Sequence, residues 1–260
     1  MNRKLNMLSG LVVLNILSTL AWINFEDLRH RALLDRLDLR LLSVPPAVNP
    51  ASFLDQLRRI YGQKLYSQSD EETLIRFFFK DKREGFFVDV CAGDYQRDSM
   101  TFYLEKHLDW KGIATDDNEV YVIDYAKHRP HTRFVRGVVT DGSDPEISKE
   151  IAWNLRRIIM PVITLNKLLE DEQVKTIDFL SMNMGLGDPA ALKGFDINRF
   201  RPKLVCIAAI DHVSNAKSLL KDYFRRNGYE RVEEFTLLDR ANWYFAPAGN
   251  GRRVRRVPGQ

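Results

Sequence analysis

Residues 86–94 read FFVDVCAGD, an apolar run that passes into a short polar loop. The first five residues are apolar apart from Asp89, and Gly85 precedes them, which is typical of a buried strand. The loop that follows contains Gly93, a residue that lets a ligand approach the backbone closely. This combination predicts the first strand of an α/β sheet with a ligand site at its carboxyl end.

Strands and helices alternate along the rest of the chain. Residues 100–107, 189–194 and 216–227 are predicted to be helices, and the last of them ends at Asn227-Gly228, a good helix stop. Further strands are predicted at residues 112–115, 133–139, 177–182 and 203–208, and an antiparallel pair at residues 229–235 and 243–245. Such alternation predicts a mainly parallel sheet with helices on both faces.

Acidic residues follow the first two predicted strands. Asp94 lies in the loop after the first strand, and Asp116 comes directly after the second. A carboxylate at the second position can accept both hydroxyls of a ribose, so the pair is compatible with a nucleoside site. The alternative is structural, with Asp94 capping a helix and Asp116 starting a turn. The two residues alone leave both interpretations open.

Short motifs occur in a fixed order between residues 66 and 247. They are YSQ (66–68), GFFVDV (85–90), AGD (92–94), SMTFYLE (99–105), WKGI (110–113), PVITLNKLL (161–169), IDFLSM (177–182), PAALKGFD (189–196), RP (201–202) and YFAP (244–247). In order and spacing they resemble the FkbM-type family of S-adenosylmethionine-dependent methyltransferases. The resemblance implies a Rossmann-like class I methyltransferase fold with a seven-stranded sheet. It also implies methyl transfer to a hydroxyl of a small-molecule or glycan acceptor.

The same resemblance assigns roles to particular residues. Asp116 matches the acid that takes the ribose hydroxyls of S-adenosylmethionine, whereas Ser99 and Glu105 match helix positions whose ordinary duties are capping and packing. Four residues match the loop that lies against the methionine and ribose portions of the cofactor: Asp89, Ala92, Gly93 and Asp94. Cys91 lies in the same loop and is a further candidate cofactor contact.

The chain departs from the family pattern around the expected pocket. Cys91 stands where the family usually has glycine, and its Cβ would crowd a ligand. Asn183 stands at a position that is commonly acidic; it can still contact the cofactor but cannot act as a base. Asp188 keeps a carboxylate, and Ala208 replaces a glutamate. Asp188 and His212 are the candidate catalytic residues, the latter if its loop folds back. The pocket is therefore either adapted to another ligand or part of a degenerate, methyltransferase-like binding module.

The amino terminus is strongly apolar. Residues 7–23 (MLSGLVVLNILSTLAWI) carry no charge and nearly reach the length of about 20 residues that spans a bilayer. We expect an uncleaved membrane anchor over residues 1–23, because apolar residues continue past the weak cleavage site at Ala21. Flanking charges favour a cytoplasmic domain, and a cleaved signal would instead imply export. The predicted boundaries are a juxtamembrane helix and linker (24–52), the methyltransferase domain (53–248) and a basic tail (249–260).

The net charge is concentrated at the end of the chain. The sequence holds 39 Lys and Arg against 35 Asp and Glu, a balance of +4, and four of the positive charges lie at residues 252–256. The remainder is neutral, so no nucleic-acid partner is expected. Two cysteines exclude a disulfide framework and a cysteine-based zinc site. His107, His128 and His131 lack ligand spacing, so no metal is expected.

Overall fold

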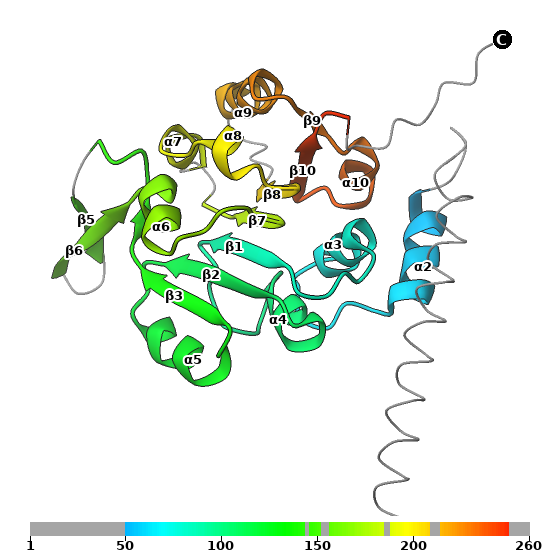
Figure 1. The fold of residues 1–260 in the computed structure, drawn as a ribbon, viewed down its shortest axis with the longest axis horizontal. Coiled ribbons are helices and arrows are strands. Elements are labelled where there is room, and N and C mark those ends of the chain that lie inside the picture. The colour runs from blue at the N-terminus through cyan, green and yellow to red at the C-terminus, as the bar shows by residue number, and fades with distance from the viewer. Residues whose placement is uncertain (1–49, 144–145, 152–155, 185–187, 209–213, 250–260) are drawn as a thin grey trace, which may run out of the picture. The chain divides into compact units, whose positions relative to one another are not determined.

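The structure is a computed structural model that describes residues 50–143, 146–151, 156–184, 188–208 and 214–249 (Figure 1). These residues belong to one compact unit, residues 49–252. The predicted N-terminal anchor, most of the predicted linker and nearly all of the basic tail lie outside the described residues. Within the described ranges no helix is both long enough and apolar enough to cross a bilayer.

A seven-stranded sheet forms the centre of the unit, in the order β3-β2-β1-β7-β8-β10-β9 (Figure 1). Its strands are parallel except β10, which is antiparallel to both β8 and β9. This is the class I methyltransferase architecture, so the predicted mainly parallel seven-stranded sheet is confirmed. The strands are β1 (Phe86–Val90), β2 (Lys111–Asp116), β3 (Thr132–Arg136), β7 (Phe179–Met182), β8 (Leu204–Ala208), β9 (Tyr229–Arg231) and β10 (Asn242–Pro247).

Helices cover both faces of the sheet (Figure 1). One face carries α3 (Glu71–Phe79), α4 (Phe102–Leu108), α5 (Val120–His128) and α10 (Glu233–Leu238), with α2 (Pro50–Tyr61) packed on α3 and α10. The other carries α6 (Leu165–Asp171), α7 (Asp188–Lys193), α8 (Ile197–Phe200) and α9 (Ser214–Arg226). Helix α2 begins at Pro50, so its first turn lies within the predicted linker. Helix α9 ends before Asn227-Gly228, as predicted, and Gly228 has a φ of +72°.

The main core lies between the sheet and α6–α9. Alternate residues of the central strands point to this side, among them Val88, Val90, Leu180 and Val205, and all are fully buried. The opposite face of the same strands carries polar side chains under α3, α4 and α10. Asp89, Ser181, Cys206 and Tyr244 stand side by side across four strands there. Buried polar groups in such a row require hydrogen-bond partners.

Two predicted strands differ from the structure. The predicted strand 133–139 is broken at Gly137, whose amide donates to the carbonyl of Asp116 (3.0 Å). Val138–Val139 then forms β4, which joins β5 (Glu146–Ile151) and β6 (Arg156–Ile163) in a second sheet of order β4-β6-β5. Strand β6 passes so close that a Cβ on Gly137 would lie 2.4 Å from Ile163. A residue larger than glycine at the break would have to displace the Ile163 side chain.

The predicted strand 229–235 is wrong beyond Arg231, because residues 233–238 form helix α10. Glu233 and Glu234 lie in its first turn, where negative charge stabilises a helix N-terminus. Phe235 is buried; its ring centre lies 5.2 Å from that of Tyr244, edge to face, and 6.1 Å from that of Phe77. Packing against α3 and β10 thus outweighs the strand propensity of this segment.

Gly112 in β2 is a position where any side chain would disturb the sheet. A Cβ there would lie 2.3 Å from the ring of Phe87 on β1, and both residues are buried. We expect Gly112→Ala to lower the free energy of unfolding by about 1–3 kcal/mol, because the aromatic ring must move in a packed core. Urea unfolding of the variant measures this. Unchanged stability would mean that Phe87 has room to rotate away.

Candidate functional site

The predicted cofactor residues lie at one edge of the sheet. Val90, the last residue of β1, pairs with Thr115 on β2 and with Met182 on β7. Because the three strands are parallel, Cys91, Asp116 and Asn183 follow at the same carboxyl edge. The structure therefore brings together residues that are 25 to 92 positions apart, at the edge where open α/β sheets bind ligands.

Residues 91–94, called the cofactor loop below, turn sharply away from β1. Cys91 has a φ of +57° and Gly93 a φ of +67°, both in the left-handed region. The amide of Ala92 donates to the carbonyl of Thr115 (3.0 Å), which fixes the start of the loop to β2. A Cβ built on Gly93 would meet nothing within 4 Å. A ligand therefore has room to approach the backbone at Gly93.

Asp116 connects the end of β2 to this loop. Its Oδ2 accepts the amide of Gly93 (3.0 Å), and its Oδ1 accepts the amide of Asn118 (3.0 Å). Each carboxylate oxygen has two acceptor sites, so one site on each oxygen is still available. The side chain is partly exposed. Asp116 can thus hold the loop and still accept two hydroxyls.

Asp94 has a capping role, which was the structural alternative that the sequence left open. Its Oδ1 accepts the amides of Gln96 (2.9 Å) and Arg97 (2.7 Å), so the carboxylate caps the turn after the cofactor loop. Ser99 likewise caps the start of α4, where its Oγ accepts the amides of Thr101 (3.3 Å) and Phe102 (3.1 Å). Whether Asp94 also contacts a ligand stays a prediction.

Asp89 lies beneath the loop and faces away from solvent. It is 4% exposed, and its Oδ2 accepts the hydroxyl of Thr101 on α4 (2.8 Å). Burial raises the pKa of Asp89, against the opposing effects of hydrogen bonds from Thr101 and Ser181 and the positive charge of Arg129. In this arrangement Asp89 supports the loop from the protein side. Its contact with a cofactor stays a prediction.

The acceptor side of the edge is only partly described. Asn183 is exposed after β7, and its backbone amide donates to the carbonyl of Val90 (3.1 Å). Asn183 therefore lies directly beside the cofactor loop. Asp188 begins α7, but its side chain lies outside what the structure describes, as does all of His212. Both catalytic candidates therefore remain predictions.

A buried ion pair under the loop involves a residue that the sequence did not single out. Arg129 is 1% exposed and its guanidinium Nε donates to Glu105 on α4. Glu105 also accepts the amide of His131 (2.9 Å) and the hydroxyl of Thr132. Glu105 is thus more than a packing residue. The sequence around Arg129, HRPH (128–131), contains no pattern that predicts burial of this arginine.

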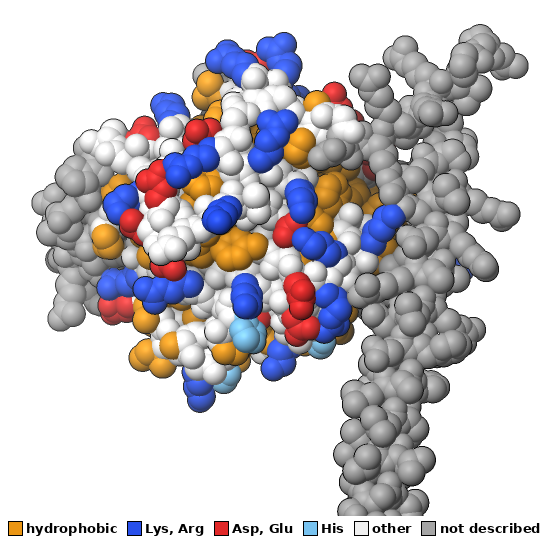
Figure 2. Space-filling view, viewed as in Figure 1, with side chains coloured by type: hydrophobic (Ala, Val, Ile, Leu, Met, Phe, Trp, Pro, Cys, Tyr) orange, Lys and Arg blue, Asp and Glu red, His pale blue; other side chains and the backbone are white. Residues whose placement is uncertain are grey.

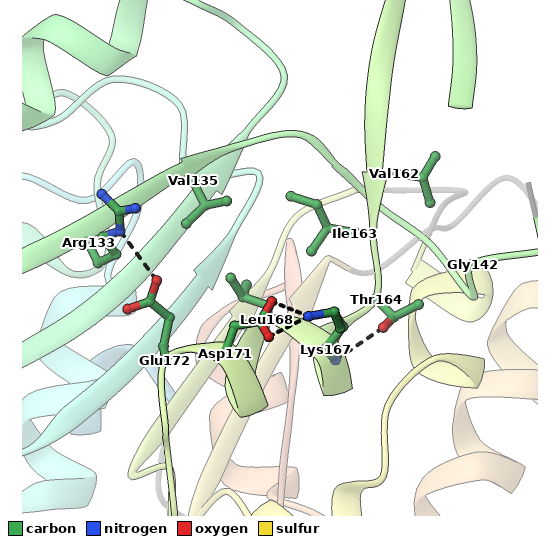
Figure 3. Close-up of a pocket in the computed structure, with 10 residues that line it drawn as sticks. All are labelled: Arg133, Val135, Gly142, Val162, Ile163, Thr164, Lys167, Leu168, Asp171 and Glu172. Carbon is green, nitrogen blue, oxygen red and sulfur yellow. Dashed lines mark hydrogen bonds and ion pairs between the residues drawn. The ribbon is translucent and has the colours of Figure 1, made fainter. Parts of the chain in front are cut away.

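A cavity of about 540 Å³ lies elsewhere, between β3, β6 and α6 (Figure 3). Its charged lining residues pair with one another: Lys167 with Asp171, and Arg133 with Glu172 (3.3 Å). Thr164 caps α6 by accepting the amide of Lys167 (3.2 Å). None of the predicted cofactor residues lines this cavity, and β6, which forms one wall, was not predicted.

The surface charges of the described residues are mixed. On the face shown in Figure 2, Lys and Arg side chains are interspersed with Asp and Glu side chains, as the neutral balance of the body of the chain predicts. In the described part of the chain, no group of three or more His, Cys, Asp and Glu side chains is arranged to hold a metal ion.

The left-handed conformation of Cys91 places strain on the backbone of the cofactor loop. A left-handed conformation costs a residue other than glycine about 1–2 kcal/mol. Glycine avoids this cost, but its greater freedom in the unfolded chain destabilises the folded state by about 0.5–1 kcal/mol. We expect Cys91→Gly to raise the free energy of unfolding by about 0.5–1 kcal/mol, and the β-branched Cys91→Val to lower it by about 1 kcal/mol. Urea unfolding measures both. A less stable glycine variant would show that contacts of the Cys91 side chain exceed the backbone strain.

Comparisons with known proteins give similarity at the level of three-dimensional structure. No family model matches the chain, and no curated protein matches it by sequence. Among solved structures, a TehB-like SAM-dependent methyltransferase from Corynebacterium glutamicum is 15% identical with a TM-score of 0.43, covering 76% of this chain and 97% of that one. A precorrin-6y C5,15-methyltransferase from Geobacter metallireducens is 10% identical with a TM-score of 0.40, covering 65% of this chain and 75% of that one.

A SAM-dependent methyltransferase from Geobacter sulfurreducens, solved in complex with S-adenosyl-L-homocysteine, is 9% identical. Its TM-score is 0.38, and the match covers 69% of this chain and 75% of that one. The assignment of the fold rests on the strand order of the sheet and not on these likenesses.

Proposed function

We propose that the chain is an S-adenosylmethionine-dependent methyltransferase of the FkbM type, which methylates a hydroxyl on a carbohydrate or envelope-related acceptor. One observation carries the cofactor assignment: the Asp116 carboxylate bonds the amide of Gly93 at the carboxyl edge of β1 and β2. This joins the two elements that such a site needs, a backbone open to a ligand and an acid for ribose hydroxyls.

The residues at this edge fit the cofactor. Gly93 leaves open space where its Cβ would be, so the ligand can approach the main chain. Asp116 retains one acceptor site on each carboxylate oxygen, which matches a pair of vicinal hydroxyls. Asn183, exposed beside the loop, offers both a donor and an acceptor. The motif order between residues 66 and 247 supports the FkbM type.

Methyl transfer from S-adenosylmethionine requires the protein mainly to align the donor methyl group with the acceptor oxygen. S-adenosylmethionine, when bound, supplies a methyl group on a sulfonium, whose thioether is a good leaving group. The cofactor loop and Asp116 would hold the donor at the edge of the sheet, and the acceptor would have to reach the methyl group from the side of Asn183. The acceptor hydroxyl loses its proton as the new C–O bond forms, and Asp188 or His212 would take that proton.

The alternative function is a binding module that keeps the fold without catalysis. Its support is the neutral side chain at Asn183, exposed at the end of β7 where relatives commonly carry an acid, together with Ala208 at the end of β8. Neither side chain can remove a proton. Turnover of any acceptor by the purified chain would eliminate this alternative.

The decisive experiment is calorimetric titration of the full chain with S-adenosylmethionine and S-adenosylhomocysteine. Micromolar binding of either, about −8 kcal/mol, is the expected result. Absence of binding at millimolar ligand, from protein shown to be folded by circular dichroism, would overturn the cofactor assignment. If S-adenosylmethionine binds, radiolabelled methyl transfer to hydroxyl-bearing envelope glycans would identify the acceptor.

We also propose that residues 1–23 anchor the protein in a membrane with the catalytic domain in the cytoplasm, where the cofactor is made. The support is the uncharged apolar run at residues 7–23. Carbonate extraction of membranes and protease protection of the domain test this. A mature protein that begins after Ala21 and is found outside the cell would overturn both the anchor and its orientation.

A further inference from the structure

The cofactor loop is supported by a buried network centred on Arg129. Arg129 follows α5, and its amide donates to the carbonyl of Tyr125 (2.8 Å), so the positive charge sits at the carboxyl end of a helix, where it is favoured. Only 1% of the side chain is exposed. The guanidinium lies 5.3 to 5.7 Å from the ring centres of three aromatic residues: Phe87, Phe102 and Tyr125.

Each nitrogen of this guanidinium donates to a different residue. Nε donates to Glu105 on α4, Nη1 to the carbonyl of Tyr95 (2.9 Å), and Nη2 to the hydroxyl of Thr101 (3.2 Å). The planar fork of arginine can make three such bonds at once, whereas the ammonium of lysine cannot match this geometry. Glu105 compensates the buried charge, which would otherwise cost several kcal/mol.

Two of the three bonds lead to the two ends of the cofactor loop. The hydroxyl of Thr101 donates to Asp89 Oδ2 (2.8 Å), and Asp89 lies two residues before Cys91. Tyr95 comes just after Asp94, and its ring stacks on His128, the last residue of α5, at 4.5 Å. The guanidinium is therefore connected to the residues on both sides of the loop.

We propose that Arg129 is a positioning residue for the cofactor site: it holds the cofactor loop by its two ends, through Thr101 and Asp89 on one side and the carbonyl of Tyr95 on the other. This inference deepens the proposed function and rests on it only where cofactor affinity is concerned. The loop is thus ordered before a ligand arrives, so binding does not have to order it.

Two variants separate the positioning role from folding. Arg129→Lys keeps a positive charge beside Glu105 but loses the fork, and Thr101→Val removes the link to Asp89 without changing charge or much volume. The hydroxyl of Thr101 does not itself cap α4; Ser99 Oγ, which accepts the amides at the helix start, is kept in this variant. Both are compared in the full chain by amide hydrogen exchange over residues 91–97 without ligand, and by calorimetry with S-adenosylhomocysteine.

Arg76→Lys is the matched control. Arg76 is also buried, 6% exposed, and pairs with Asp81 through Nε (2.9 Å) and Nη2 (3.0 Å), but it makes no hydrogen bond to the loop. We expect both test variants to raise exchange in the loop about tenfold and to weaken S-adenosylhomocysteine binding by about ten- to a hundredfold. The control is expected to lose comparable stability in urea while leaving loop exchange and affinity at wild-type values.

The outcomes are distinguishable. If wild-type protein binds the ligand but neither test variant changes loop exchange or affinity, the positioning role is wrong. If the control changes both as much as the test variants do, Arg129 contributes only to general stability and the proposal is also overturned. If wild-type protein binds no ligand, the proposed function fails, and loop exchange alone still decides whether Arg129 holds the loop.

Discussion

Replacing Asp116 with alanine is expected to weaken S-adenosylhomocysteine binding about a hundredfold. The carboxylate has one remaining acceptor site on each oxygen, and hydrogen bonds to a charged group contribute about 1.5–3 kcal/mol each. The variant also removes the acceptor of the Gly93 amide, which weakens the connection of the loop to β2, although the bond from the Ala92 amide to the Thr115 carbonyl stays. Calorimetry on the folded variant measures the loss, since each tenfold corresponds to about 1.4 kcal/mol.

A second substitution separates these two contributions. Asp116→Asn keeps one carbonyl oxygen that can accept the Gly93 amide, but it replaces the other acceptor with a donor. We therefore expect it to bind about tenfold more weakly than wild type and about tenfold more tightly than the alanine variant. Glu119→Gln, a nearby loss of charge on a 73% exposed side chain, serves as control and should bind normally. Wild-type affinity of Asp116→Ala would refute the assignment of this edge as the cofactor site.

The central strands were predictable because each is a largely apolar run that is buried on both faces. Strand β1 is found at the predicted residues 86–90, and β8 begins only one residue after its predicted start. Strand β5 was missed because Glu146, Lys149 and Glu150 give its six residues three charges, a composition that is unfavourable in strands. Only its pairing with β6 makes it a strand, and that pairing is a property of the folded chain.

The loop residues were predictable for a related reason. In a parallel sheet, whatever follows a strand lies at the carboxyl edge, so sequence position alone brings Gly93 and Asp116 to the same place. The support beneath them was not predictable, because Arg129 reaches Tyr95 and Thr101 across 34 and 28 positions of sequence. No local pattern distinguishes a buried arginine from an exposed one, since burial depends on a partner such as Glu105 that only folding provides.

Asp178 connects three segments at the opposite, amino-terminal edge of the sheet. Its Oδ1 accepts Lys82 Nζ (2.9 Å) and Lys203 Nζ (2.6 Å), and its Oδ2 accepts the amide of Phe86 at the start of β1 (3.0 Å). The carboxylate itself is only 11% exposed. We expect Asp178→Ala to lower the free energy of unfolding by about 3 kcal/mol, because the Phe86 amide loses its charged acceptor and two ammonium groups are left together.

The loss of stability caused by Asp178→Ala should become smaller as the pH falls. Burial raises the pKa of Asp178, but hydrogen bonds from Lys203, Lys82 and the Phe86 amide outweigh it, so the pKa lies below its usual value. A lowered pKa in the folded state means that the stabilisation is complete above the unfolded value, about 3.9, and is lost as the pH falls through the folded one. Urea unfolding should therefore show a wide gap between wild type and Asp178→Ala at about pH 6, and a narrow one near pH 2. Asp171→Ala, which removes a 56% exposed partner of Lys167, should cost less than about 0.5 kcal/mol at either pH. A gap that stays constant with pH would show that Asp178 acts through packing and not through its charge.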